Sequence, residues 1–208
     1  MNTEESSSLK QYLETKKKTI DAALDRFLPP EDCYPSVIFK AIRYSIFAGG
    51  KRIRPIIMLA IADMFNKPFK QILPASCAVE YIHTSTLILD DLPCMDDSAL
   101  RRGRLSVHKK FTESTAILAS YALVSLAFEL LVKNARSVSN DADLAFEVTR
   151  SMSDGMGLKG VCCGQYIDLQ SGSKKISPCR LNYLHEHKTA DLFTAACSIA
   201  AYLSGADK

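Results

Sequence analysis

Residues 71–97 read QILPASCAVEYIHTSTLILDDLPCMDD, an apolar run that follows Pro74 and ends in paired acids. Proline suits the first turn of a helix, and apolar residues along the run recur at helical rather than strand spacing. The stretch therefore predicts a long buried helix that begins near Pro74 and brings acidic side chains to its last turn.

The same helical spacing recurs along the rest of the chain, and few runs alternate as half-buried strands do. Prolines and glycines separate the helical segments, for example Pro29-Pro30 and Gly49-Gly50. Further helices are expected at about residues 9–27, 35–47, 56–65, 113–133, 141–159 and 180–203, with turns at 137–141 and 171–173. We therefore expect one all-α domain over residues 1–208.

The composition is that of an ordinary soluble globular protein. Of the 208 residues, 47% are hydrophobic and 24% are charged, which excludes a disordered tail, a collagen-like fibre and a multi-span membrane protein. Lys and Arg number 26 against 23 acidic residues, so the net charge is only +3. Bulk charge therefore predicts no nucleic-acid partner.

The cysteines and the N-terminus indicate a cytoplasmic protein. Seven cysteines, an odd number, show no Cys-x-x-Cys spacing. The first residues, which include Glu4 and Glu5, lack the basic-then-apolar order of a signal peptide, so we expect reduced thiols. The longest apolar stretch, Ala116 to Phe128, is stopped by Glu129 and predicts a core helix rather than a transmembrane segment.

Four carboxylates end the first helix within eight residues: Asp90, Asp91, Asp96 and Asp97. Acids this close repel one another unless cations neutralise them, and Mg²⁺ is usually held by one or two carboxylates together with substrate phosphates. A charged, solvated loop would not explain why the acids directly follow the apolar run 87–89. The pattern indicates a divalent-cation site, although Pro93 loosens the turn and leaves open which acids converge.

Two basic clusters accompany the acids. Gly49-Gly50-Lys51-Arg52-Ile53-Arg54-Pro55 leads cations into the start of a helix, where free N–H groups and arginines favour a phosphate. Leu100-Arg101-Arg102-Gly103-Arg104 follows the acids, with His108 close behind. Acids that collect metal beside bases that collect phosphate are expected at a diphosphate–Mg²⁺ site. Surface acid–base pairing alone would not require two separate basic clusters.

These segments together resemble the trans-isoprenyl diphosphate synthases, the family of farnesyl and geranylgeranyl diphosphate synthases. The resemblance continues through Gly164-Gln165-Tyr166-Ile167-Asp168 and His187-Lys188-Thr189-Ala190, and the order of the motifs holds over nearly the whole chain. Each motif is weak by itself, whereas the ordered set is highly specific. The resemblance implies an isoprenoid-synthase-type helical bundle around a central apolar cavity, and a homodimer packed through long helices.

The resemblance also implies roles for the matching positions. The residues that would hold the diphosphate of isopentenyl diphosphate are Lys51, Arg54, His83 and Arg102. The acids that would bind Mg²⁺ on the allylic diphosphate are Asp90, Asp91 and Asp96, aided by Arg101 and Lys188. The same cavity would be lined by Gln165, Asp168 and Thr189. Bulky residues before the acids limit product length in this family, so the small Ser85 and Thr86 favour a product longer than farnesyl.

The implied reaction joins isopentenyl diphosphate to an allylic diphosphate (dimethylallyl, geranyl or farnesyl) and gives farnesyl or geranylgeranyl diphosphate. Mg²⁺ and the cationic side chains would stabilise the departing diphosphate, and the double bond of isopentenyl diphosphate would attack the allylic cation. This chemistry needs positioning and electrostatic stabilisation but no nucleophilic side chain. His185 and His187 stand two residues apart, which does not place both on one helix face, so we expect no zinc site there.

The chain departs from the family in one large respect. The family carries a second Asp-rich motif on a later helix, but no paired acids follow Asp168 and the sequence stops at Lys208. We expect the C-terminal helices of the family to be missing, either from a truncated synthase or from a natural short homologue. A non-catalytic or regulatory subunit of a synthase is therefore the alternative. A head-to-head prenyl synthase or terpene cyclase is weaker, because residues 49–55 suit isopentenyl diphosphate.

Overall fold

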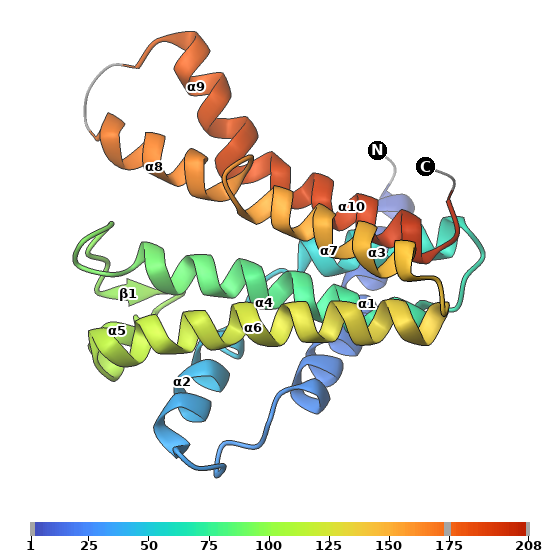
Figure 1. The fold of residues 1–208 in the computed structure, drawn as a ribbon, viewed down its shortest axis with the longest axis horizontal. Helices are drawn as coiled ribbons and strands as arrows, with labels where there is room; N and C mark the ends of the chain where they lie inside the picture. Colours follow the sequence, from blue (N-terminus) through green and yellow to red (C-terminus); the bar gives the residue numbers. More distant parts are fainter. Residues whose placement is uncertain (1–2, 173–175, 207–208) are drawn as a thin grey trace.

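The computed structural model describes residues 3–172 and 176–206. These residues form a helical bundle with one short hairpin, whose two strands have two residues each (Figure 1). This confirms the all-α prediction. The elements are α1 (Thr3–Phe27), α2 (Ser36–Ile46), α3 (Ile53–Met64), η1 (Phe69–Gln71), α4 (Leu73–Asp90), β1 (Leu100–Arg101), β2 (Arg104–Leu105), α5 (Val107–Lys110), α6 (Glu113–Val138), α7 (Ala142–Met156), α8 (Val161–Ser171), α9 (Pro178–Leu184), η2 (His185–Ala190) and α10 (Asp191–Leu203).

Helix α4 is the central element of the bundle. It packs against α1, α3, α6 and α10, and every residue from 75 to 82 is buried. A helix that is buried on all sides has neighbours all round it, which explains the apolar run in the sequence. Burial becomes one-sided from His83 onward, because the half-buried residues 83, 86, 87 and 90 share one helix face. The second half of α4 therefore has one accessible face.

Helix α6 lies along α4 and also packs against α2 and α7 (Figure 1). Small and aliphatic side chains such as Ala119, Leu123 and Ala127 are fully buried on its inner face. Its outer face carries the exposed side chains of Ile117, Leu118 and Tyr121. By length and composition α6 could cross a membrane, as many core helices of soluble proteins could, and its packed face is that of a bundle helix.

Helices α3, α7 and α10 form a second group, with α10 packed against both α3 and α7. Helices α8 and α9 form a hairpin that projects from the bundle toward the same end as β1 (Figure 1). This hairpin returns to the bundle through η2, a π-helical turn that also packs against α8. The hairpin and the turn therefore bring residues 161–172 and 176–190 to the end of the bundle where α4 terminates.

The structure corrects several predicted elements. The single helix expected over residues 180–203 is two helices, α9 and α10, separated by the π-helical turn η2. Helix α8 and the short hairpin β1–β2 were not predicted, and α7 ends at Met156 because the chain leaves the helix at Gly157. Helix α6 continues to Val138, beyond the expected end near residue 133. Of the turn expected at 171–173, Ser173 lies outside the described residues.

Candidate functional site

The chain leaves α4 at Asp91 and folds into a tight acidic turn. Asp96 N donates to Asp90 O at 2.9 Å, and Ser98 N donates to Asp91 O at 3.2 Å. These bonds return the chain to the end of α4, so Asp96 comes back beside Asp90. Asp97 instead has a φ of 46°, is exposed, and lies 3.7 Å from Lys109. The turn therefore brings Asp96 back toward Asp90, on which the charges of Asp91 and Asp96 act, and leaves Asp97 beside Lys109.

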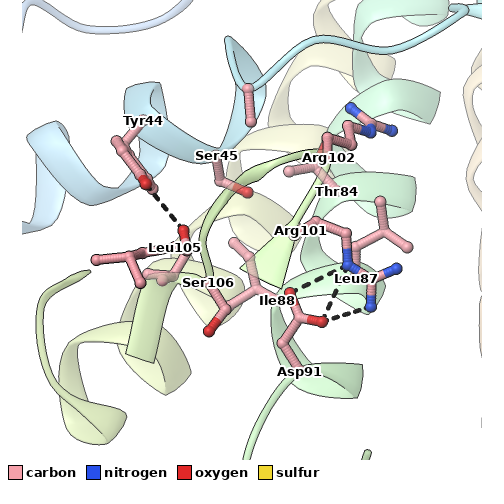
Figure 2. A pocket seen from close by; sticks show the side chains of 12 residues that line it. Tyr44, Ser45, Thr84, Leu87, Ile88, Asp91, Arg101, Arg102, Leu105 and Ser106 are labelled. Carbon is pink, nitrogen blue, oxygen red and sulfur yellow. Dashed lines mark hydrogen bonds and ion pairs between the residues drawn. The ribbon is translucent and has the colours of Figure 1, made fainter. Parts of the chain in front are cut away.

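Asp91 is held by Arg101 from the hairpin. Arg101 Nε donates to Asp91 Oδ1 at 2.9 Å, and a second nitrogen of the same guanidinium grips the same carboxylate (Figure 2). The Asp91 side chain is only 4% exposed. The hairpin that carries Arg101 is fastened to α2, because Tyr44 OH donates to Leu105 O at 2.8 Å. Because both sides of the pair are anchored, the orientation of the Asp91 carboxylate is fixed.

Asp90 carries the clearest electrostatic signature in the acidic turn. Its pKa is raised to about 6, first by burial and then by the charges of Asp96 and Asp91, although Lys188 and Arg101 oppose the rise. A partly desolvated carboxylate beside two more acids gains from a multivalent cation. Within the described residues, no group of three or more His, Cys, Asp or Glu side chains is arranged to hold a metal ion. An open set of acids still suits Mg²⁺, which commonly completes its coordination with water and substrate phosphates.

Lys188 reaches this region from the π-helical turn. It forms an ion pair with Asp168 of α8, and its charge acts on Asp90. Gly164 allows this approach, because a Cβ at that position would overlap the backbone nitrogen of Lys188. His187 links η2 to the start of α10, because its Nδ1 lies 2.6 Å from Asp191 Oδ2. Close backbone packing and this pair place Lys188 opposite the acids.

A cavity of about 510 Å³ lies beside Glu80 and His83 of α4, about two helical turns before the acids. The residues that line it and bear on its chemistry are Gly49, Gly50, Lys51, Arg54, His83, Arg102 and Phe193. Gly50 has a φ of 147°, and a Cβ there would lie 2.7 Å from Arg102 Nη1. Glycine is therefore required where Arg102, which donates to Gly49 O, crosses the loop.

Of the cations that line this cavity, Arg52 is paired with Glu80, whereas Lys51, Arg54 and Arg102 form no ion pair among the described residues. Burial lowers the pKa of Arg54 although Glu80 opposes the effect, and within the described residues Arg54 Nε has no hydrogen-bond partner. The pKa of His83 falls to about 3, first through burial and then through the charges of Arg54 and Arg102. Unpaired cations around a concave pocket create a positive potential, so the cavity favours an anion.

Arg52, the middle cation of the loop, has a different role from its neighbours. Its side chain is 1% exposed, donates to Glu80 and Asp21, and also donates to Ile46 O at 2.7 Å. Arg52 has a φ of 53° and lines the cavity together with Lys51 and Arg54, but its guanidinium is engaged by these partners. Arg52 therefore builds the floor of the site and leaves the other two cations to face a ligand.

The remaining predicted site residues differ in their accessibility. Gln165 Nε2 is buried without a partner among the described residues, whereas Thr189 is exposed on η2. Ser85 is 2% exposed in the contact with α6, where Ser120 Oγ donates to its backbone oxygen at 3.1 Å. Thr86 is half-buried on the accessible face of α4. Thr86 is therefore the better placed of the two small residues to border a substrate.

Two contributors were not predicted from the sequence. Phe193 of α10 lines the cavity, and the ring centroid lies 4.1 Å from Arg54 Cζ. Gly164 sets the distance between α8 and the π-helical turn. An apolar residue within an apolar helix carries no sequence signal for the first role. The glycine in the Gly-Gln-Tyr-Ile-Asp motif was a signal for the second, since a helical glycine costs stability unless it has a reason.

Comparison with known proteins agrees with this geometry. A family model described as polyprenyl synthetase matches residues 35–208. A dimethylallyltranstransferase of Fischerella ambigua is 38% identical over 206 residues, which are 99% of this chain and 58% of the relative. Geranylgeranyl pyrophosphate synthase 4 of Arabidopsis thaliana is 42% identical over 203 residues, which are 96% of this chain and 53% of the relative.

Solved structures show the same fold. The apo structure of an FPP/GFPP synthase from Zymomonas mobilis superimposes with a TM-score of 0.89 at 32% identity, over 97% of this chain and 73% of that one. A geranyltransferase from Legionella pneumophila gives a TM-score of 0.88 at 30% identity, over 95% and 70%. The chain spans a little more than half the length of the two relatives named above. Its sequence and fold show that it belongs to the polyprenyl synthetase family.

Proposed function

We propose that the chain is a short-chain trans-prenyltransferase that joins isopentenyl diphosphate to an allylic diphosphate. The observation that carries this proposal is the pairing of two sites on one face of α4, with His83 in the cation-lined cavity and Asp90 in the acidic turn. His83 and Asp90 are seven residues apart, so they lie on the same helix face, about 10 Å apart along the helix axis. That separation suits two diphosphates whose carbon chains meet between them.

In the cavity, Lys51, Arg54 and Arg102 would hold the diphosphate of isopentenyl diphosphate. The guanidinium groups of Arg54 and Arg102 present parallel donors that match phosphate oxygens, and the ammonium group of Lys51 adds a point charge. His83 would stay neutral, because burial and neighbouring cations keep its pKa low, and would contribute a hydrogen bond rather than charge. Arg52 and Glu80 would keep the floor of this cavity rigid.

At the acidic turn, Asp90, Asp91 and Asp96 would hold Mg²⁺, which when bound neutralises diphosphate charge and makes that group a better leaving group. Arg101 fixes the Asp91 carboxylate, and the charge of Lys188 acts on Asp90. These two cations would stabilise the negative charge that develops on the allylic diphosphate as the carbon–oxygen bond breaks. The side chains therefore position the reactants and supply electrostatic stabilisation.

The exposed apolar face of α6 supports a homodimer as part of the proposal. Ile117 is 49% exposed, Leu118 55% and Tyr121 76%, and they stand on one side of a helix whose opposite side is core. Contiguous exposed apolar side chains mark association surfaces. The small Thr86 beside the acidic turn favours the longer product, geranylgeranyl diphosphate, over farnesyl diphosphate.

A non-catalytic or regulatory subunit is the second candidate. One observation favours it: among the described residues, no group of three or more His, Cys, Asp or Glu side chains is arranged to hold a metal ion. Such a subunit would still bind diphosphates in the cavity. It would not form a carbon–carbon bond by itself.

One experiment separates the two candidates. The chain is incubated with labelled isopentenyl diphosphate and either dimethylallyl or farnesyl diphosphate, with and without Mg²⁺, and acid-labile product is measured. Mg²⁺-dependent product that disappears in Asp90→Ala, but persists in the matched variant Asp97→Ala, supports the prenyltransferase. No product from a folded chain that still binds pyrophosphate supports the subunit. Product formation that survives Asp90→Ala would contradict the metal-ligand assignment.

A further inference from the structure

The arginines around the two sites are held in two different ways. Carboxylates hold Arg52, through Glu80 and Asp21, and also Arg101, through Asp91. Arg52, Arg54 and Arg102 all line the cavity, and neutral groups hold the last two. Arg102 donates to the carbonyl of Gly49, and Arg54 stacks on the ring of Phe193. A carboxylate would orient a guanidinium but would also cancel its charge. A carbonyl or an aromatic ring orients it and leaves the charge available.

The Arg54–Phe193 contact has the geometry of a cation–π pair. The guanidinium carbon lies 4.1 Å from the ring centroid, within the distance at which such pairs are attractive. The ring quadrupole attracts the guanidinium through its negative face and occupies none of its N–H groups. Phe193 is half-buried and lines the same cavity as Arg54, so the pair stands at the wall of the anion site.

The contact also joins two helices. Arg54 lies in the first turn of α3, Phe193 lies in the first turn of α10, and the two helices pack against each other. Within the described part of the chain, Arg54 takes part in no ion pair, and burial works against its charge. Without the ring, a long and rotatable side chain would have to be ordered by the ligand itself, which costs affinity.

We propose that Phe193 is a positioning residue for the anion site, which preorganises the Arg54 guanidinium by stacking and leaves its donors free for a diphosphate. This inference rests on the proposed diphosphate role of the cavity. The predicted consequence is that the aromatic character of residue 193, rather than its bulk, sets the affinity for a diphosphate.

The test measures pyrophosphate binding to the 208-residue chain by titration calorimetry, which needs no turnover. Phe193→Leu should weaken binding by about two- to thirtyfold, the range that the loss of a cation–π contact allows. Phe193→Tyr should bind within about twofold of the unchanged chain, because a phenol ring stacks as well. The matched control is Phe27→Leu, which removes a similar stack, that of Arg26 at 4.5 Å from the ring centroid, outside the cavity.

A merely structural role for Phe193 is excluded by two further measurements. In an Arg54→Ala background, Phe193→Leu should cause no further loss of affinity, because the pair acts as one unit. Replacing Phe193 with a trifluorinated phenylalanine keeps the shape of the ring but weakens its negative face, and should also reduce affinity. This replacement keeps the proposal testable if Phe193→Leu fails to fold.

Two outcomes would overturn the proposal, and they differ. If pyrophosphate binds with a dependence on Arg54 but Phe193→Leu and the fluorinated ring leave affinity unchanged, Phe193 is not a positioning residue and the diphosphate assignment stands. If the unchanged chain binds no pyrophosphate, or Arg54→Ala has no effect, the diphosphate assignment of the cavity fails and the inference fails with it.

Discussion

Arg52 Nη1 lies 2.7 Å from Glu80 Oε1, and both side chains are almost completely buried, at 1% and 3% exposure. The pair joins the loop before α3 to the middle of α4, directly below the cavity. Removing one partner of a buried ion pair leaves an uncompensated charge in the interior. Glu80→Gln should therefore lower the free energy of unfolding by about 3 kcal/mol, measured by urea denaturation.

The matched control for this prediction is the exposed pair between Glu129 and Lys133 on α6. Glu129→Gln should change the free energy of unfolding by no more than about 0.5 kcal/mol, since exposed pairs one helical turn apart contribute little. Equal effects of the two substitutions would mean that the Arg52–Glu80 pair does not hold the floor of the site.

His83 should make the chain sensitive to acid. Its pKa is about 3 in the fold, lowered by burial and by Arg54 and Arg102, against an ordinary value of 6.5. Between these values the unfolded chain binds a proton that the folded chain does not, so stability is lost as the pH falls below 6.5. Relative to His83→Gln, the unchanged chain should lose about 2 kcal/mol of unfolding free energy between pH 7.5 and pH 5.

A bound anion gives a second readout of the same prediction. Pyrophosphate in the cavity would favour protonated His83, raise its pKa and reduce the acid sensitivity. Denaturation curves at several pH values, with and without pyrophosphate, would show this. The unfolding free energies of the unchanged chain and of His83→Gln are compared at each pH. If their difference is the same at every pH, the burial of the imidazole among cations is contradicted.

Gly164→Ala should destabilise the chain, although the same change in an open helix is stabilising by up to about 1 kcal/mol. The added Cβ would overlap the backbone of Lys188 and His187, which cannot move aside as a side chain can. A loss of about 1–3 kcal/mol is expected, together with faster amide hydrogen exchange over residues 185–190. The exposed Gln170 on the same helix offers a control, since Gln170→Ala should be near neutral. A gain in stability for Gly164→Ala would show that α8 and η2 are not in backbone contact.

The sequence was sufficient for the helices whose limits are marked locally. Helix α4 begins at Leu73 beside the predicted Pro74 and ends at the predicted acids, because a proline and a polar run mark its two ends. The break at η2 could not be predicted. Its extra residue is stabilised by contact with the backbone of α8 at Gly164, which is distant in sequence. Local patterns carry no information about such contacts.

For the site, the motifs predicted which residues gather but not how they are held. Backbone hydrogen bonds in the turn return Asp96, but not Asp97, to Asp90. Residue spacing alone left open which acids would come together. Arg52 is engaged by Glu80 in the floor of the cavity instead of being free to bind an anion. This role depends on a left-handed backbone conformation that a non-glycine residue rarely adopts. The part played by Phe193 depends on the packing of α10 against α3.

The two small residues before the acids should respond differently to enlargement. Thr86 is half-buried on the face of α4 that carries His83 and Asp90, so Thr86→Phe should narrow the space beside the acidic turn and shift the product toward shorter chains. Ser85 is buried against α6, so Ser85→Phe should instead overpack the core and lower the free energy of unfolding by about 1–3 kcal/mol. Product length is measured with labelled isopentenyl diphosphate, and stability by urea denaturation. A stable Ser85→Phe variant that shortens the product, beside an unaffected Thr86→Phe, would reverse the assignment and place the growing chain between α4 and α6.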